Sequence, residues 1–301
     1  MKNETMKNLI ERHAAAEGFT ETPIEGLQLF RISEPIERLP SVYPPSVCAV
    51  VQGRKHAYLD GQRYVYDPSH YICGTMPFPV QAEAPFATKE EPILGMMLSL
   101  ETRAMAEIVV EYEATADPLR ESPGVELTPG LMVVKWDDVF ETALYQMLAL
   151  LDDPVAARLL GKGRLRELLF AVIRGEAGAL VRRSFGHSHD LTRALNYLRD
   201  NLNENLSVDD LAQKAGMSRA VFHRRFKAAT TYSPLQFIKA LRLSDAAMMI
   251  AQGMNVSEAA DTVGYTSASQ FSREFRRHFG HTPRAWGKIA ATSGTDVQAI
   301  I

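Results

Sequence analysis

Hydrophobic residues follow two different periods along this chain. From Leu27 to about Leu100, short β-rich runs are separated by Pro, Gly and Asp, and these runs read LQLFRIS, SVCAVVQ, HAYLD, QRYVYD, HYICGT and ILGMMLSL. Strands this short and closely spaced are typical of an all-β sandwich or barrel. The pair Asp60-Gly61 predicts a tight hairpin between two of the runs, because Gly accepts the positive φ that such a turn demands.

After Leu100 the spacing of hydrophobic residues becomes helical. The stretches ETRAMAEIVVEYEA, DDVFETALYQMLALL and DPVAARLLGKGRLRELLFAVIRGEAGAL carry apolar residues such as Leu144, Leu148 and Leu151 at helical intervals. We expect amphipathic helices here, and the pattern leaves open whether they pack internally or join two copies of the chain. Residues 182–190, RRSFGHSHD, lack periodicity and are interpreted as a linker.

The C-terminal third contains an internal repeat. Residues 208–237 and 256–286 share a frame of small residues, a Gly, two Phe four positions apart and a Pro. The matching residues are Ala212, Gly216, Phe222, Phe226 and Pro234 in the first copy, and Ala260, Gly264, Phe271, Phe275 and Pro283 in the second. Duplication over this length indicates two copies of one structural unit.

Each copy has the parts of a helix-turn-helix. Ser207 precedes Asp210 by three residues, and Asn255 precedes Glu258 likewise, which is the spacing of a capping box at the start of a helix. The Gly of each copy supplies the backbone conformation of a sharp turn. The two Phe then define the buried face of a second helix, so the opposite face is free to meet DNA.

The free face of each second helix carries polar and cationic side chains. Arg can bridge guanine O6 and N7, and Gln can pair with adenine, whereas cations near the helix ends are better placed to contact phosphates. We therefore predict a DNA-binding set of Arg219, His223, Arg224 and Lys227 in the first unit and Ser269, Gln270, Arg273 and Arg276 in the second, with Lys227 and Arg276 on phosphates.

The segment between the repeats predicts one long helix. PLQFIKALRLSDAAMMIAQG begins with Pro234 and ends with Gly253, which are the residue types favoured at the start and just past the end of a helix. Such a helix is roughly 30 Å long, close to the ~34 Å between successive major-groove faces on one side of B-DNA. One chain is thus expected to place two helices in adjacent grooves.

The charge distribution agrees with this division. Residues 187–288 hold 14 Lys and Arg against 9 Asp and Glu, whereas residues 1–186 hold 19 against 26. A basic part attached to an acidic part is expected when only one of them meets phosphates. The formal net charge of the whole chain, -3, would not have revealed it.

At this point the C-terminal residues resemble a known family. From about Asp190 to Lys288, the stretches LSVDDLAQKAGMS, SRAVFHRRFK, SPLQFIKALRL and VGYTSASQFSREFRRHFGHTPRAW resemble the DNA-binding domain of the AraC/XylS transcription regulators. The resemblance implies that Ala220, His223 and Arg224, and Ser269, Gln270 and Arg273, take the base-facing positions. Ala220 is apolar, which argues against hydrogen-bonded readout at that position.

Residues 45–80 resemble the N-terminal domain of one AraC-type subfamily, which implies a cupin-like β-barrel. The expected fold class is therefore α+β, with a cupin-like barrel followed by helices and an all-α domain that holds two helix-turn-helix units joined by a linker helix. The expected domains are a barrel with an effector site at 1–135, a helical connector or dimerisation segment at 136–186, a DNA-binding domain at 187–288 and a tail at 289–301.

The sequence offers little support for metal, redox or enzyme chemistry. His56 and His70 stand alone rather than in the H-x-H pair of metal-binding cupins, and the one H-x-H, His187 and His189, falls in the predicted linker. Cys48 and Cys73 lie in apolar runs and are interpreted as buried thiols, with redox sensing left open. No catalytic motif is present, so we expect no enzyme, cofactor or metal.

The favoured hypothesis is a cytoplasmic regulator that binds double-stranded DNA and responds to a small effector in the barrel. Tyr58, Tyr64, Tyr66 and Tyr71 are candidates to line the effector site, although at strand spacing half of them should face outward. RNA polymerase and a second copy of the chain are the other expected partners, and no membrane span is expected. The alternatives are a regulator without an effector, a cupin enzyme with a DNA-binding tail, and a protein-interaction module.

Overall fold

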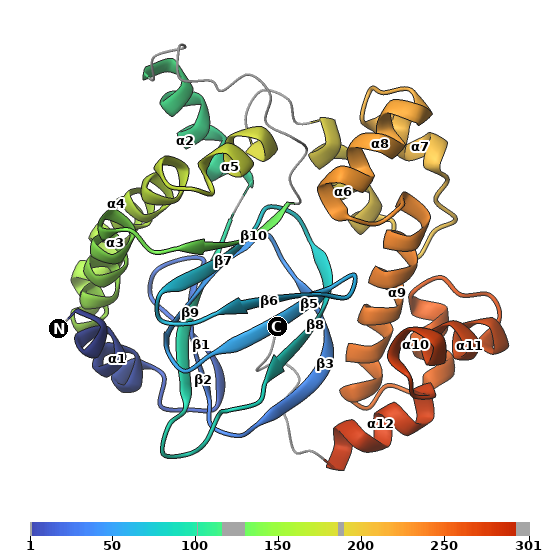
Figure 1. Ribbon diagram of the computed structural model, residues 1–301, viewed down its shortest axis with the longest axis horizontal. Helices are drawn as coiled ribbons and strands as arrows, with labels where there is room; N and C mark the ends of the chain where they lie inside the picture. Colours follow the sequence, from blue (N-terminus) through green and yellow to red (C-terminus); the bar gives the residue numbers. More distant parts are fainter. Residues whose placement is uncertain (1, 101, 116–129, 186–189, 293–301) are drawn as a thin grey trace.

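The computed structural model describes residues 2–100, 102–115, 130–185 and 190–292. A barrel of two β-sheets lies at the centre, with helices along one side and a helical C-terminal domain along the other (Figure 1). The predicted α+β class and the cupin-like barrel are confirmed. None of the helices in the described ranges is long and apolar enough to cross a membrane.

The barrel consists of two antiparallel sheets. The larger has the order β1 (Gly18–Glu21), β2 (Leu27–Ile32), β9 (Ile93–Ser99), β4 (Ser46–Gln52), β7 (His70–Gly74) and β10 (Leu131–Lys135). The smaller has the order β3 (Ile36–Tyr43), β8 (Phe78–Ala84), β5 (Lys55–Leu59) and β6 (Gln62–Tyr66). The predicted hairpin joins β5 to β6, where Asp60 and Gly61 have φ of 49° and 79°.

The larger sheet is covered on both faces, which explains its continuous apolar runs. In β4, Val47, Ala49 and Val51 pack towards the helices, while Cys48 and Val50 point into the barrel. A strand buried on both faces needs apolar residues at every position. The sequence therefore located β4 and β9 well, although neither strand alternates between apolar and polar residues.

Four strands escaped the sequence prediction, namely β1, β3, β8 and β10. β3 and β8 contain Pro40 and Pro79, which lower the strand signal. β10 has the apolar, β-branched run LMVVK, but it follows α2 and the segment 116–129 in the chain, so the sequence did not indicate that it pairs with β7.

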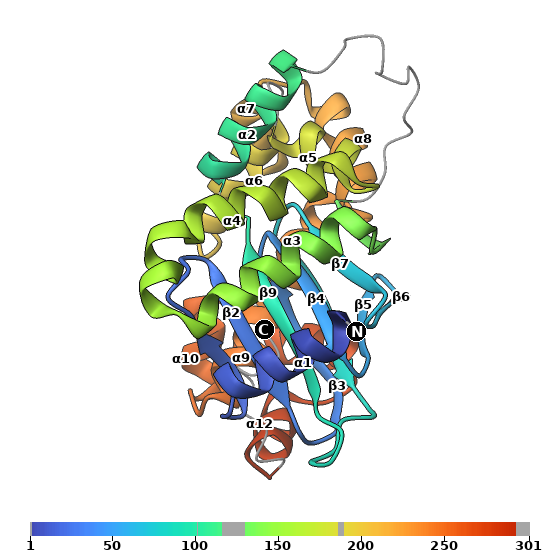
Figure 2. The same ribbon diagram turned by 90° about the vertical axis from the view of Figure 1, so that its left-hand side faces the viewer.

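Helices α1 (Lys2–His13), α3 (Asp138–Ala149) and α4 (Pro154–Arg174) cover the outer face of the larger sheet (Figure 2). The side chains of Asp137 and Asp153 cap the first turns of α3 and α4, and a short 3-10 helix, η2 (Leu150–Asp152), joins them. Leu144, Leu148 and Leu151 are buried in this layer. Their stripe is therefore internal packing. The sequence did not predict α1, whose exposed face is polar.

The predicted linker at residues 182–190 is wrong over its first part. Arg182–Phe185 belongs to α5 (Gly178–Phe185), where Val181 and Phe185 are buried against the helical layer. The buried residues explain the helix, because tertiary packing stabilises a helix whose local hydrophobic periodicity is weak. Residues 186–189, with His187 and His189, lie outside the described part of the chain. α2 (Thr102–Thr115) packs beside α4 and α5.

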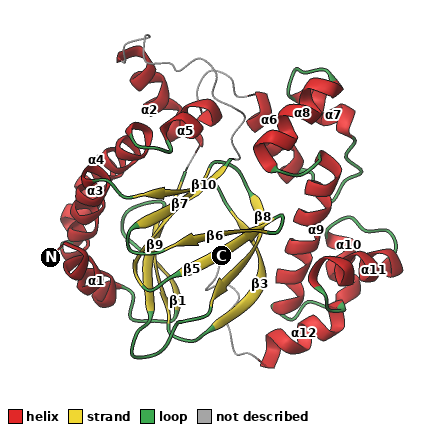
Figure 3. Cartoon of the chain, in the orientation of Figure 1, coloured by secondary structure: helices red, strands yellow, loops and turns green. Residues whose placement is uncertain are grey.

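The C-terminal domain is entirely helical in its described residues (Figure 3). It comprises α6 (Asp190–Asp200), α7 (Val208–Lys214), α8 (Arg219–Thr230), α9 (Pro234–Ala251), α10 (Val256–Thr262), α11 (Ala268–Phe279) and α12 (Pro283–Thr292). α12 continues to Thr292, past the point where the sequence placed the start of a tail. The middle helix α9 packs against β3 and β8 of the barrel.

Candidate DNA-binding surface

The first helix-turn-helix unit consists of α7 and α8. The hydroxyl of Ser207 accepts from the N–H of Asp210, and the Asp210 carboxylate accepts from the N–H of Ser207, so the predicted capping box is present. Gly216 in the turn has a φ of 61°, and Ser218 caps α8 by accepting from Val221 N–H. The sequence thus specified both helix starts and the turn between them.

Phe222 and Phe226 fix the orientation of α8. Both are fully buried, with ring centroids 5.3 Å apart, and Phe226 packs edge-on against Phe237 of α9. The opposite face of α8 is exposed and carries every residue predicted for this unit, Arg219, Ala220, His223, Arg224 and Lys227. Arg219 forms an ion pair with Asp209 of α7 at 2.9 Å, so its guanidinium is also held against the first helix.

The second unit, α10 and α11, repeats the arrangement with a different first cap. Asn255 Oδ1 accepts from Glu258 N–H at 2.8 Å, but Glu258 contacts the Asn255 side-chain amide rather than its backbone N–H. The predicted capping box is therefore wrong in this detail, since Asn offers its own donor to the carboxylate. Gly264 has a φ of 85°, and Ser267 caps α11.

α11 buries Phe271 and Phe275 and exposes the four residues predicted for this unit, Ser269, Gln270, Arg273 and Arg276. Glu274 lies between the two faces and accepts from Tyr265 Oη at 2.8 Å, Lys239 Nζ at 3.0 Å and Gln270 Nε2 at 3.2 Å. Burial by itself would raise the pKa of Glu274, but these hydrogen bonds lower it below its ordinary value. Glu274 therefore stays charged and orients Gln270.

Two more cations lie on the exposed surface. Arg225 on α8 and Arg277 on α11 are exposed beside the predicted residues. The sequence analysis did not include them in the predicted set. Each directly follows a predicted cation, Arg224 or Arg276, so the sequence could have indicated both.

The helix α9 sets the relation between the two units, which lie at its opposite ends in Figure 1. It has 18 residues, or roughly 27 Å at ~1.5 Å per residue, and begins with Pro234 at its first turn. The predicted linker helix is confirmed. Trp286 of α12 donates to the Ala247 carbonyl at 2.8 Å, which fastens the second unit to the far half of α9.

The first unit also contacts the barrel. Tyr232 Oη accepts a hydrogen bond from Asp60 N–H at the tip of the β5–β6 hairpin at 3.1 Å. Ala229, at the end of α8, accepts from Gly130 N–H at 2.7 Å. Two hydrogen bonds therefore join the barrel to the C-terminal end of α8 and to the residues that follow it.

The four candidate tyrosines divide between faces. Tyr64 and Tyr66 point into the barrel, Tyr71 stacks on Phe140 in the helical layer, and Tyr58 lies on the outer surface of the smaller sheet, where it donates to Glu83. Two of the four thus face inward, as the alternation along strands requires.

The two isolated histidines are hydrogen-bonded to carboxylates, and both cysteines are buried. His56 hydrogen-bonds Glu83 at 2.9 Å and His70 hydrogen-bonds Asp67 at 3.2 Å. Burial raises the pKa of Cys48, and it raises the pKa of Cys73 to about 12. High thiol pKa values disfavour the reactive thiolate. Within the described ranges, no three His, Cys, Asp or Glu side chains gather as a metal site would require.

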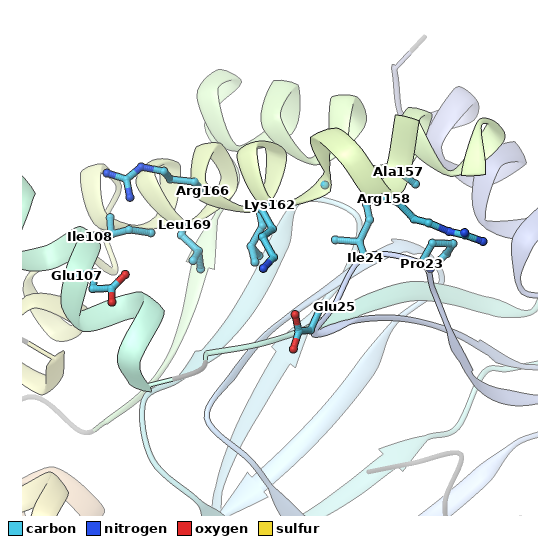
Figure 4. Close-up of a pocket in the computed structure, with 12 residues that line it drawn as sticks. Pro23, Ile24, Glu25, Glu107, Ile108, Ala157, Arg158, Lys162, Arg166 and Leu169 are labelled. Carbon is cyan, nitrogen blue, oxygen red and sulfur yellow. The ribbon is translucent and has the colours of Figure 1, made fainter. Parts of the chain in front are cut away.

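A cavity of about 620 Å³ lies between α4, α2 and the turn that joins β1 to β2 (Figure 4). Ile24, Ile108 and Leu169 form apolar parts of its lining, and Glu25, Glu107, Arg158, Lys162 and Arg166 add charges of both signs. It lies on the helical side of the barrel, away from α8 and α11.

Comparisons with known proteins agree with this architecture. Residues 23–180 match the family model of the AraC-type transcriptional regulator N-terminus, and residues 211–289 match a helix-turn-helix domain model. The transcriptional regulator ArgR of Pseudomonas aeruginosa is 33% identical over 106 residues, which are 35% of this chain and 32% of that protein. Histidine kinase P4 of Formosa agariphila is 34% identical over 95 residues, 31% of this chain but 7% of that protein.

The chain thus spans about a third or less of the length of these curated relatives. Among solved structures, ToxT of Vibrio cholerae with a bound unsaturated fatty acid is similar over 90% of this chain and 95% of its own, with a TM-score of 0.54 and 10% identity. This likeness extends to the arrangement of barrel and helical domain. Since the N-terminal family model covers more than half of the chain, the protein belongs to the AraC-type family of transcriptional regulators.

Proposed function

We propose that this protein reads specific DNA by placing α8 and α11 in adjacent major grooves. The observation that carries the proposal is the two-faced character of both helices, each with two buried Phe and a polar, cationic face in solvent. An exposed cationic face on the second helix of both copies is what contact with the phosphates and base edges of a duplex requires. The helix α9, capped at its start and packed against the barrel, lies between the two units, and its length of roughly 27 Å is comparable to the ~34 Å of one turn of DNA.

Within this surface the residues divide by task. His223, Arg224, Ser269, Gln270 and Arg273 are assigned to base edges, and Ala220 to an apolar contact such as a thymine methyl accepts. Arg219, Lys227 and Arg276 are assigned to phosphates, together with Arg225 and Arg277. Arg219 already forms an ion pair with Asp209. It is therefore expected to add less to the DNA-binding free energy than Lys227 and Arg276.

The barrel is proposed to hold a small effector and to report it through the first unit. ToxT has been solved with an unsaturated fatty acid and with a naphthalenyl butenoic acid, which supports a ligand-binding role for this architecture. In the present chain the hydrogen bonds from Asp60 and Gly130 to the first unit supply a physical route from the barrel to DNA.

Further parts of the proposal follow the family. We propose that the chain acts in the cytoplasm as a regulator rather than an enzyme, with RNA polymerase as a protein partner. The proposed domains remain 1–135, 136–186, 187–288 and 289–301. A second copy would dock on the outer face of α4, where Val155, Leu159 and Leu160 are exposed by 67%, 76% and 55%.

The test is selection of genomic fragments with the purified full-length chain, followed by binding to the enriched site at several salt concentrations. We expect a site with two motifs about one helical turn apart and an affinity that falls steeply with salt, because phosphate contacts release counterions. Fragments without a shared motif, or salt-independent binding, would refute the proposal and favour a protein-interaction module.

A further inference from the structure

The carboxylate of Glu274 on α11 is held by donors from three parts of the C-terminal domain. Its side chain is 13% exposed. Oε1 accepts from Lys239 Nζ of α9 at 3.0 Å and from Gln270 Nε2, four residues earlier on α11, at 3.2 Å. Oε2 accepts from Tyr265 Oη, in the turn before α11, at 2.8 Å. Glu274 is therefore fixed from outside its own helix, unlike an ordinary solvated pair of side chains on one helix.

These contacts decide which way the amide of Gln270 points. Burial alone would raise the pKa of Glu274, and its hydrogen bonds bring that pKa below the ordinary value, so the group is an ionised carboxylate. An ionised carboxylate only accepts hydrogen bonds, whereas the Gln amide has a donor end and an acceptor end of nearly the same shape. The nitrogen of Gln270 must therefore face Glu274, because the amide oxygen would be repelled.

This orientation limits what Gln270 offers to a partner. Gln270 is exposed on α11, and one of its two N–H groups is taken by Glu274. The groups left are the carbonyl oxygen and one N–H. In the major groove adenine presents the N6 donor and the N7 acceptor, which these two groups complement. Guanine presents two acceptors, O6 and N7, and a Gln would need both of its N–H groups to satisfy them.

The first unit has no equivalent pair. In the repeated frame Gln270 directly precedes Phe271 and Glu274 directly precedes Phe275. The residues that directly precede Phe222 and Phe226 in the first unit are Val221 and Arg225, an apolar residue and a cation. A fixed amide is thus a property of the second unit alone, and it follows from side chains in which the two copies differ.

We propose that Glu274 is a positioning residue that makes Gln270 select adenine over guanine at one base pair of the operator. This inference rests on the proposed function, because it requires α11 to lie in a major groove. Glu274 acts through Gln270 and does not itself contact DNA. Lys239 and Tyr265 contribute by holding the carboxylate in place.

The test uses the full-length chain and the operator obtained by fragment selection. Each base pair of the operator is changed in turn, and affinities are compared at one salt concentration, since phosphate contacts make affinity depend on salt. Gln270→Ala identifies the base pair that Gln270 meets as the one whose preference is lost. We expect adenine there, preferred over guanine by about 10- to 100-fold in the parent chain.

Glu274→Gln then tests the positioning role. The new amide has nearly the same shape, but it can donate to the oxygen of Gln270, so that both N–H groups of Gln270 become available to guanine. We expect the preference for adenine to fall to about threefold or less, with the preferences at all other base pairs unchanged. Asp261→Asn is the matched control, because it removes one negative charge from an exposed position on α10 of the same unit. It should keep the full preference for adenine.

A second variant covers the case in which Glu274→Gln does not fold, as circular dichroism would reveal. Lys239 is 48% exposed and lies on α9, and Lys239→Met removes one of the two outside anchors of the carboxylate. We expect it to lower the preference for adenine by about threefold, the size of effect that loss of a partly exposed ion pair produces.

The inference is wrong if the folded Glu274→Gln chain keeps the full preference for adenine, or if Lys239→Met keeps it where Glu274→Gln does not fold. It is equally wrong if guanine is preferred where Gln270 acts. A fall in all base preferences of the second unit together would mean that Glu274 only stabilises the fold. An operator whose base preferences do not depend on Glu274 overturns this inference alone, whereas the absence of any enriched operator overturns the proposed function and this inference with it.

Discussion

The two helix-turn-helix units are copies in sequence but differ in what supports them. The first unit shares a hydrophobic cluster with the barrel and hydrogen-bonds it through Tyr232 and Ala229. The second has a different cluster, formed with the far half of α9 and with α12, and Leu39 of β3 is its contact with the barrel. The difference teaches that the two copies of one sequence frame are supported by different neighbours, and under the proposed function it makes the first unit the one through which the barrel would act.

The turn glycines of the two units also differ in their surroundings. Both have positive φ, but a Cβ on Gly264 would lie 2.4 Å from the Asn203 carbonyl oxygen, whereas one on Gly216 would meet nothing within 4 Å. Gly264→Ala should therefore destabilise the protein by about 2 to 5 kcal/mol, from backbone strain plus overpacking, and Gly216→Ala by about 1 to 2 kcal/mol. Urea denaturation followed by circular dichroism measures both, and equal losses would contradict the asymmetry.

Base reading should depend on one arginine from each unit. Arg224→Ala and Arg273→Ala should each cost ~1 to 3 kcal/mol at one operator position and relax base preference there, because a bidentate contact to guanine is lost. Quantitative binding to single-base operator variants provides the measurement, with Arg63→Ala on the exposed face of β6 as the control. Equal losses on all DNA sequences would assign these arginines to phosphates instead.

Removal of one tyrosine hydroxyl from each unit tests how much the hydrogen bond of that hydroxyl stabilises the protein. Tyr265 donates to a carboxylate inside the second unit, so Tyr265→Phe should lower stability by roughly 1.5 to 3 kcal/mol. Tyr232 accepts from a neutral backbone N–H of the barrel, so Tyr232→Phe should cost roughly 0.5 to 1.5 kcal/mol.

The two variants should also differ in effector response. Tyr232→Phe is expected to weaken the effect of a bound effector on DNA affinity, and Tyr265→Phe to leave that effect intact. Thermal denaturation and DNA binding with and without effector decide the matter. A normal effector response in Tyr232→Phe would show that the hairpin contact carries no signal.

The smallest expected difference concerns the first caps. Ser207→Ala removes a reciprocal capping box and should cost about 1 kcal/mol, whereas Asn255→Ala removes a one-way backbone cap and should cost slightly less. Chemical denaturation of both variants beside the parent chain checks the order. A larger loss for Asn255→Ala would mean that its amide contact with Glu258 matters more than the backbone bond.

The sequence by itself determined the features that depend on near neighbours. The Asp60-Gly61 hairpin, the helix caps, the positive φ of Gly216 and Gly264 and the length of α9 follow from residue types within a few positions of one another. The exposed positions of the predicted DNA-binding residues were equally readable, because the paired Phe fix which face of each helix is buried. The duplicated frame then made the prediction of two units secure.

Only the tertiary structure decided what depends on distant segments. β10 is a strand because β7 lies beside it, and Arg182–Phe185 are helical because Val181 and Phe185 find a core to enter. Lys55 reads as an ordinary cation next to a turn, yet the curvature of the barrel brings it among Phe30, Cys48 and Tyr66. Local propensity cannot foresee such burial, since the groups that surround Lys55 come from distant parts of the chain.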